Sequence, residues 1–108
     1  MKALITGASS GIGKDMAIYL DSLGYEVFLA GRNKERLQET ANLCKNAKAI
    51  YDYDLSIDAN VYKLYEKVKG EKIDLLINNA GFGLFGFFDE TDLDKELEMI
   101  DVNIKALH

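Results

Sequence analysis

Glycines and hydroxyl side chains gather near the amino terminus, in the sequence TGASSGIG at 6–13. Backbone amides and hydroxyl groups in such a loop can donate hydrogen bonds to a diphosphate, and a helix that starts there adds the positive end of its dipole. Gly7 would turn the chain off a strand, while Gly11 and Gly13 would allow close approach of backbone, helix and diphosphate. The residues predicted to bind the diphosphate are Gly7, Ser9, Ser10, Gly11, Ile12 and Gly13.

The same segment does not fit the loop of nucleotide triphosphatases. That loop has four residues between its glycines, followed by Lys and then Ser or Thr. Here five residues (8–12) separate Gly7 from Gly13, and Asp15 follows Lys14 where a magnesium-binding hydroxyl belongs. The sequence therefore disfavours an NTPase, and no metal site is predicted.

A second group of candidate residues follows the apolar run EVFLA at 26–30. An acidic residue at this point of a dinucleotide fold would accept hydrogen bonds from both ribose hydroxyls of NAD. Gly31 instead leaves space, and Arg32 supplies a cation for a 2′-phosphate, so NADP is favoured over NAD. In the alternative interpretation, Arg32 pairs with Glu35 or Glu39 on the surface. Lys14 and Lys34 are interpreted as solvated side chains.

The third group is NNAG at 78–81, which follows another apolar run. Adjacent buried amides must satisfy several hydrogen-bonding groups, so Asn78 and Asn79 are suited to linking neighbouring strands. The small Ala80-Gly81 turn would then admit a cofactor. A plain turn is the alternative for the two asparagines alone.

Apolar runs alternate with amphipathic segments around these groups. Strands are predicted at 2–6, 26–30, 48–53 and 73–77. Helices are predicted from the spacing of Ile12, Met16, Tyr19, Leu20 and Leu23 before Gly24, of Leu37, Ala41 and Cys44 before Asn46, and of Val61, Leu64, Tyr65 and Val68 before Gly70. Ser56 or Asp58 is the expected N-cap of the third helix.

The remaining segment is predicted to hold a loop and a further helix. Residues 80–88 mix glycine with phenylalanine, which is typical of a loop, and Thr91 is the expected N-cap of the helix. Its apolar stripe is Leu93, Leu97, Ile100, Ile104 and Leu107. The alternation of strand and helix with short connections predicts an α/β fold, a parallel sheet with right-handed crossovers and helices on both faces. Ligands of such sheets bind at the carboxyl ends of the strands, where the three polar groups lie.

Composition limits the class of protein. With 108 residues, 48% of them hydrophobic, the chain is expected to form one globular domain. A net charge of −5 favours neither a nucleic acid nor an anionic membrane as partner. The first residues do not resemble a signal peptide, and no stretch has membrane-spanning length. The single cysteine, Cys44, fits a reducing cytoplasm.

The motifs at 6–13, 54–55 and 78–81 resemble, in this order, those of the short-chain dehydrogenase/reductase family, and the similarity extends through all 108 residues. The resemblance implies a three-layer Rossmann-type doubly wound parallel sheet with strand order 3-2-1-4. It also implies an oxidoreductase that transfers hydride between NAD(P) and a small carbonyl or alcohol substrate. It implies that Asp54 bonds the adenine amino group and that Leu55 lines the adenine pocket. It also implies that Asn79 and Gly81 contact the cofactor ribose, and that Asn103 holds a water in the proton relay.

The family's catalytic Ser, Tyr and Lys would follow the asparagine helix, and residues 1–108 contain no counterpart. A Tyr-x-x-x-Lys pattern at Tyr65 and Lys69 precedes NNAG, and Tyr65 belongs to an apolar helical stripe, so we interpret the match as chance. Residues 1–108 are therefore expected to be an N-terminal NAD(P)-binding Rossmann half-domain that is inactive alone.

Two other hypotheses stay open at the level of sequence. The chain could be a non-catalytic NADP-binding or sensing module, or an inert truncated fragment. The uncovered outer edge of the fourth strand and the apolar stripe of the last helix predict self-association, so a homo-oligomer is expected. Phe82, Phe85, Phe87 and Phe88 could shape an apolar substrate pocket or serve only packing.

Overall fold

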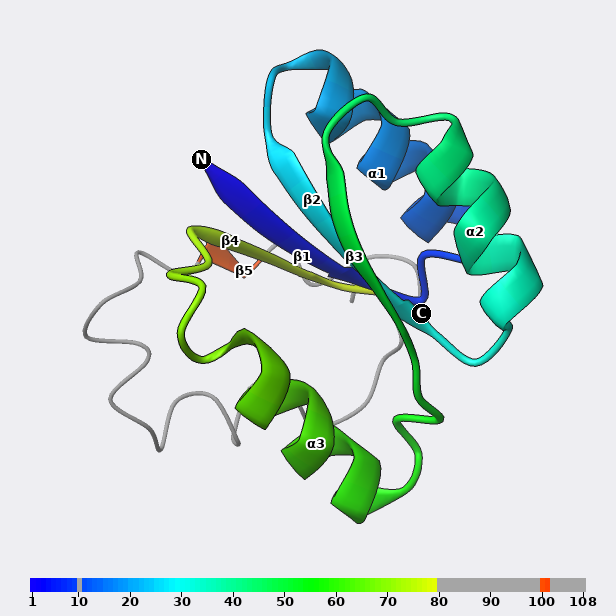
Figure 1. Ribbon diagram of the computed structural model, residues 1–108, viewed down its shortest axis with the longest axis vertical. Coiled ribbons are helices and arrows are strands. Elements are labelled where there is room, and N and C mark those ends of the chain that lie inside the picture. The colour runs from blue at the N-terminus through cyan, green and yellow to red at the C-terminus, as the bar shows by residue number, and fades with distance from the viewer. Residues whose placement is uncertain (10, 80–99, 102–108) are drawn as a thin grey trace.

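The computed structural model of the chain describes residues 1–9, 11–79 and 100–101. Strands and helices alternate from the amino terminus through β4 (Figure 1). The strands are β1 Lys2–Thr6, β2 Glu26–Gly31, β3 Ala47–Asp52, β4 Leu75–Asn78 and β5 Ile100–Asp101. The helices are α1 Gly11–Ser22, α2 Lys34–Asn42 and α3 Asp58–Val68. The predicted strands are confirmed, with ends that differ by no more than two residues.

The sheet is parallel, and its strands lie in the order β3-β2-β1-β4-β5. The predicted order 3-2-1-4 is therefore confirmed. β1 is central, and its last residue, Thr6, lies opposite Ala30 of β2 and Asn78 of β4. Because the strands run in the same direction, their carboxyl ends meet at one edge of the sheet.

Helices cover both faces of the sheet, α1 and α2 on one side and α3 on the other (Figure 1). Successive side chains of a strand point to opposite faces, so each strand contributes to two cores. The core under α3 contains Leu4, Phe28, Ala30, Leu55, Val61, Leu64, Val68, Ile73 and Leu76. The core under α1 and α2 contains Ala3, Ile5, Ala8, Ala17, Leu20, Val27, Leu29, Leu37, Leu75 and Ile77. This arrangement confirms the predicted three-layer, doubly wound architecture.

The side of α1 that faces the sheet coincides only in part with the predicted apolar stripe, because Leu20 is buried and Met16 packs against the core. The buried positions of the helix are Gly13, Ala17, Leu20 and Asp21. Much of the stripe is exposed, with values of 44% for Ile12, 58% for Tyr19 and 57% for Leu23. A methyl group at Gly13 would lie 2.1 Å from the carbonyl oxygen of Gly7, so the start of the helix approaches the loop after β1 too closely for any side chain. Gly13 and Ala17 therefore share this contact face with Leu20, and the spacing of large residues identifies only part of it.

The end of α2 also differs from the prediction. The helix ends at Asn42 rather than near Asn46. The backbone amides of Lys45 and Asn46 donate to the largely buried carboxylate of Asp21, at 2.9 Å and 2.7 Å. This carboxylate on α1 binds the segment that enters β3, and the helical conformation ends before it.

The start of α3 has no side-chain cap. Its N-cap residue is Ile57, and neither Ser56 nor Asp58 fills the predicted capping role. The Ser56 hydroxyl instead donates to Asp54 at 2.6 Å. The predicted inward face is correct, because Val61, Leu64 and Val68 are buried in the core under this helix.

The predicted last helix is wrong at residues 100–101, which form the short strand β5. This strand pairs in parallel with Leu75 and Leu76 of β4, so the outer edge of β4 is not wholly unpaired as expected. Hydrogen bonding along a sheet edge can override a helical spacing of apolar residues. The rest of that predicted helix, its N-cap Thr91, the loop 80–88 and the phenylalanine cluster lie outside the described residues.

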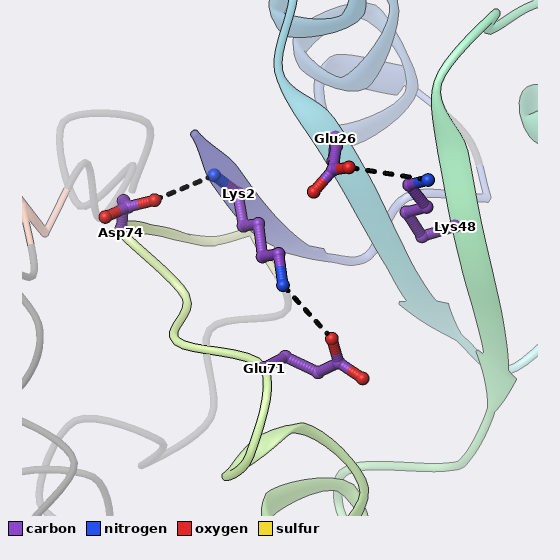
Figure 2. A network of polar contacts seen from close by, with 5 residues as sticks. All are labelled: Lys2, Glu26, Lys48, Glu71 and Asp74. Atoms are coloured by element: carbon purple, nitrogen blue, oxygen red, sulfur yellow. Dashed lines mark hydrogen bonds and ion pairs between the residues drawn. The ribbon is translucent and has the colours of Figure 1, made fainter.

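Polar contacts cluster near the amino ends of the strands (Figure 2). Lys2 Nζ pairs with Glu71 at 3.3 Å and Lys48 Nζ with Glu26 at 3.4 Å, while the Lys2 backbone amide donates to Asp74 at 2.8 Å. The ion-paired side chains are 33–52% exposed, so each pair contributes only about 0–1 kcal/mol to stability. These contacts support the starts of β1 and β4. None of the helices within the described ranges is long and apolar enough to cross a membrane.

Candidate cofactor-binding cleft

A cleft of about 1010 Å³ opens at the carboxyl edge of the sheet. Its walls come from segments at the ends of β1, β2, β3 and β4. The lining residues are Gly7, Ser9, Gly31, Arg32, Asn33, Lys34, Glu35, Arg36, Tyr53, Leu55 and Asn79. Small-molecule sites typically have volumes of roughly 300–1,000 Å³. The cleft therefore has the size for a cofactor and lies where parallel sheets bind their ligands.

The loop after β1 depends on glycine in its backbone. Gly7 and Gly11 adopt positive φ angles of 63° and 60°, a region that other residues rarely enter. At Gly13, an added Cβ would lie 2.1 Å from the Gly7 carbonyl oxygen and 2.7 Å from Asn79 Nδ2. The predicted turn at Gly7 and the predicted close packing at Gly13 are both present. α1 begins at Gly11, so its first amides have no acceptors within the helix and can face an anion.

The two asparagines after β4 link this strand to β1. The Thr6 hydroxyl donates to Asn78 Oδ1 at 3.0 Å, and both side chains are buried. Asn79 Nδ2 donates to the carbonyl oxygen of Gly7 at 3.2 Å. The prediction that these amides tie neighbouring strands together is confirmed. The Asn79 contact also holds the first residue of the glycine loop against the end of β4.

At the end of β2, a glycine packed against its neighbours is followed by a cation. A Cβ added at Gly31 would lie 3.3 Å from Ser9 Oγ and 3.3 Å from Leu37 Cδ2, so the absence of a side chain lets Ser9 pack beside β2. Arg32 follows on the cleft wall. In the part of the chain that the structure describes, Arg32 makes no ion pair, and the alternative pairing with a surface carboxylate is not observed.

The first turn of α2 adds further charge to the same wall. Asn33 is the N-cap, and its Oδ1 accepts a hydrogen bond from the Arg36 amide at 3.1 Å. This cap fixes the start of the helix at the cleft, where Arg32, Lys34 and Arg36 outnumber the single carboxylate of Glu35. The chain as a whole has a net charge of −5, so this local excess of positive charge is suited to an anionic ligand.

The end of β3 supplies an apolar side chain and a carboxylate. Leu55 lines the cleft with the small part of its side chain that is exposed. The rest is buried in the core under α3, and the residue is only 3% exposed. Asp54 lies in the chain between the lining residues Tyr53 and Leu55, and its Oδ1 accepts hydrogen bonds from the Ser56 hydroxyl at 2.6 Å and the Ser56 amide at 3.0 Å. These two bonds, with a smaller effect of the Arg32 charge, hold the pKa of Asp54 below its ordinary value. The carboxylate is therefore an ionised acceptor at neutral pH.

Ser56→Ala should raise the pKa of Asp54 toward the ordinary value of 3.8, because the Ser56 hydroxyl is the largest cause of the lowering. A depressed pKa means that the contribution of the carboxylate to folding is present above 3.8 and is lost as pH falls through the folded-state pKa. NMR titration of the Asp54 carboxyl carbon measures the shift. Ser22→Ala, which removes a hydroxyl bonded to Tyr19, is the control. An unchanged Asp54 midpoint in Ser56→Ala would contradict the assignment.

The structure brings together part of the predicted site. The predicted residues that line the cleft are Gly7, Ser9, Arg32, Leu55 and Asn79. The first residues of α1, Gly11, Ile12 and Gly13, follow the loop without lining the cleft, and Asp54 lies in the chain between two lining residues. Ser10, Ala80, Gly81 and Asn103 lie outside the described residues.

Several lining residues are absent from the sequence-based prediction. Asn33, Glu35 and Arg36 line the cleft, and Lys34, interpreted as solvated, is exposed but lines it too. Asn33 immediately before a helical segment is a recognisable N-cap. That signal would have predicted a helix that begins directly after β2, with its first turn at the cleft. Tyr53 has no such signal. Its ring stacks on that of Tyr51, two residues earlier in β3, with ring centroids 6.3 Å apart.

The Tyr-x-x-x-Lys pattern does not contribute to the cleft. Tyr65 is partly buried against the core under α3, as expected from its apolar stripe. Lys69 Nζ pairs with Glu66 at 2.9 Å, and this contact raises the pKa of Lys69. Neither residue lines the cleft, which agrees with a chance match.

Comparison with known proteins gives the family. The chain matches the short chain dehydrogenase family over residues 1–108. It is 38% identical over 109 residues to an uncharacterized short-chain type dehydrogenase/reductase of Sinorhizobium fredii, with 97% of this chain and 41% of that protein covered. It is 40% identical over 110 residues to an uncharacterized oxidoreductase of Staphylococcus saprophyticus, with 96% and 47% covered. The chain thus spans less than half the length of these curated relatives.

Solved structures agree with this match. A short-chain dehydrogenase/reductase from Vibrio parahaemolyticus superposes with a TM-score of 0.69 at 31% identity, covering 86% of this chain and 43% of that one. The bulky-bulky ketone specific alcohol dehydrogenase from Comamonas testosteroni superposes with a TM-score of 0.68 at 33% identity, covering 76% and 36%. With its glycine loop, its strand order and a family match along its whole length, the chain belongs to the short-chain dehydrogenase/reductase family.

Proposed function

We propose that this chain is the NADP-binding half of an oxidoreductase that transfers hydride between the cofactor and a small carbonyl or alcohol. The observation that carries the choice of NADP is the end of β2, where Gly31 brings no carboxylate and Arg32 lines the cleft without an ion-pair partner among the described residues. An NAD-selective site would hold a carboxylate there for the ribose hydroxyls. A guanidinium is instead suited to a 2′-phosphate, which it can bind through two parallel hydrogen bonds.

The remaining cofactor contacts follow from the cleft and from the family motifs. The glycine loop and the start of α1 would hold the diphosphate, with Ser9 at the cleft wall. By the family motif, Ser10, Gly11 and Ile12 would contribute to the same site. Leu55 would line the adenine pocket, and the ionised Asp54 would accept a hydrogen bond from the adenine amino group. The segment 79–81 would contact a cofactor ribose. Each assignment rests on the family motifs together with the donors and acceptors found at the strand ends.

The bound cofactor would supply or accept the hydride. The protein would orient the cofactor and the substrate, and its side chains would transfer the proton to or from the substrate oxygen. By resemblance to the family, Asn103 would hold a water of the proton relay, and a Ser, a Tyr and a Lys would orient and protonate the substrate carbonyl. We propose that these three residues belong to a segment after residue 108. The lengths of the relatives support this, because the chain covers only 41% and 47% of them.

We further propose a cytoplasmic homo-oligomer. Cys44 is the only cysteine of the chain, which is typical of a reducing compartment. Burial and the Asp21 carboxylate raise the pKa of Cys44, so its thiol stays protonated and resists oxidation. The exposed apolar side chains Tyr19 and Leu23 on α1 favour association, which sedimentation would detect. A monodisperse monomer would count against the oligomer.

The test of the function compares two polypeptides with NADPH and a panel of small ketones and aldehydes. The full-length protein should bind NADPH and oxidise it when a carbonyl is present, which its absorbance reports. A polypeptide limited to residues 1–108 should leave every carbonyl unreduced. Carbonyl reduction by the shorter polypeptide would refute the division of roles. NADPH binding without turnover by the full-length protein would favour a non-catalytic binding module instead.

A further inference from the structure

Thr40 is a buried hydroxyl that contacts the glycine loop from behind. It lies on α2, its exposure is 0%, and it is not among the residues that line the cleft. Its Oγ1 donates to the carbonyl oxygen of Ala8 at 3.0 Å, across 32 positions of sequence. The carbonyl oxygen of Arg36, one helical turn earlier, lies 3.2 Å from the same hydroxyl.

A threonine hydroxyl has one hydrogen, so its two acceptors compete for it. The Arg36 carbonyl lies within α2, where the amide of Thr40 is its ordinary helical donor. The Ala8 carbonyl has no other hydrogen-bond donor within the described ranges 1–9, 11–79 and 100–101. A buried carbonyl without a donor costs about 1–3 kcal/mol. The Thr40 hydroxyl is therefore expected to donate its hydrogen bond to the Ala8 carbonyl oxygen.

Ala8 is thereby held at both of its peptide groups. Its amide donates to the Ala30 carbonyl oxygen of β2 at 3.1 Å, and its carbonyl accepts from Thr40 of α2. A trans peptide is planar, so the carbonyl of Ala8 and the amide N–H of Ser9 point in opposite directions. Fixing the Ala8 carbonyl toward α2 therefore turns the Ser9 N–H away from α2. Within the described residues this N–H has no acceptor, and Ser9 itself lines the cleft.

We propose that Thr40 is a positioning residue of the diphosphate site, which orients the Ser9 amide toward the ligand through its hydrogen bond to Ala8. This inference rests on the proposed dinucleotide-binding function. Thr40 does not touch the ligand, and its effect passes through one peptide group. That peptide group belongs to the part of the site that NADP and NAD have in common. Loss of the hydroxyl should therefore weaken the binding of both dinucleotides by the same factor.

The test measures the dissociation constants of NADPH and NADH for Thr40→Val and Thr40→Ser in the full-length protein. Valine keeps the shape of the side chain and removes the donor, while serine keeps the donor. We expect Thr40→Val to raise both dissociation constants about tenfold, the equivalent of one misplaced hydrogen bond. Thr40→Ser should restore both to within about threefold of wild type. Val68→Ala, a buried truncation in α3, is the control that lowers thermal stability without changing either constant.

Three outcomes would overturn the proposal. The first is a lower melting temperature of Thr40→Val with unchanged dissociation constants, which is the result of a merely structural role. The second is a loss confined to NADPH, which would assign the effect to the cations of α2. The third is a Thr40→Ser variant as weak as Thr40→Val. If Thr40→Val does not fold, Thr40→Ala carries the same expectations. Failure of the wild-type protein to bind either dinucleotide would instead refute the proposed function.

Discussion

Gly13→Ala is expected to remove both the cofactor affinity and much of the stability of the protein. The added methyl group would lie 2.1 Å from the Gly7 carbonyl oxygen and 2.7 Å from Asn79 Nδ2. Neither neighbour can move easily, because the first is backbone and the second donates to it at 3.2 Å. α1 must therefore move off the glycine loop. We expect the free energy of unfolding to fall by about 3 kcal/mol, and the affinity for NADPH to fall about a hundredfold or more.

Urea denaturation and calorimetric titration with NADPH measure these two effects. Gly70→Ala is the matched control, because nothing lies within 4 Å of its added Cβ. It should change neither quantity appreciably. Gly24→Ala separates backbone strain from collision, since Gly24 has open space but a φ of 93°. That variant should lose about 1–2 kcal/mol of stability and keep its affinity. Wild-type affinity and stability in Gly13→Ala would contradict the close packing of α1 on the loop.

Arg32→Gln is expected to weaken NADPH binding about 10- to 100-fold and to leave NADH binding nearly unchanged. A hydrogen bond to a charged group contributes about 1.5–3 kcal/mol, and each 1.4 kcal/mol corresponds to about a tenfold change in affinity. The effect should be selective because only NADPH carries the 2′-phosphate that we assign to this guanidinium. Glutamine keeps hydrogen-bonding groups at the position, so the charge is what the variant removes.

Fluorescence titration with each dinucleotide gives the two affinities. Lys63→Gln makes the same change of charge on α3, at an exposed position outside the cleft, and controls for the net charge of the protein. It should alter neither affinity. An equal loss for NADPH and NADH in Arg32→Gln would refute the assignment of the 2′-phosphate to Arg32. No loss for either would transfer the role to the other cations of the wall, Lys34 and Arg36.

Much of the fold could be predicted from local patterns. Buried parallel strands are short apolar runs, and Gly7, Gly31 and Asn78 mark where three of them end or turn. The alternation and the right-handed crossover of consecutive parallel strands predicted a parallel sheet with helices on both faces, while the order 3-2-1-4 came with the family resemblance of the motifs. The same local logic predicted the glycine loop and the role of the two asparagines. These features depend on residues close in sequence, or on neighbours that the strand order brings together.

What the sequence by itself determined is therefore the succession of strands and helices, the family motifs from which the strand order follows, and the glycine-dependent loop at the carboxyl edge. Only the tertiary structure decided which face of α1 packs on the sheet, because the close approach at its start requires Gly13, and Ala17 is buried there beside Leu20. It also decided that Arg36 joins Arg32 at the cleft and that Thr40 binds Ala8. Such contacts join residues on different elements, and they depend on how closely and at what angle those elements pack. The spacing of apolar residues along the sequence does not determine that distance or angle.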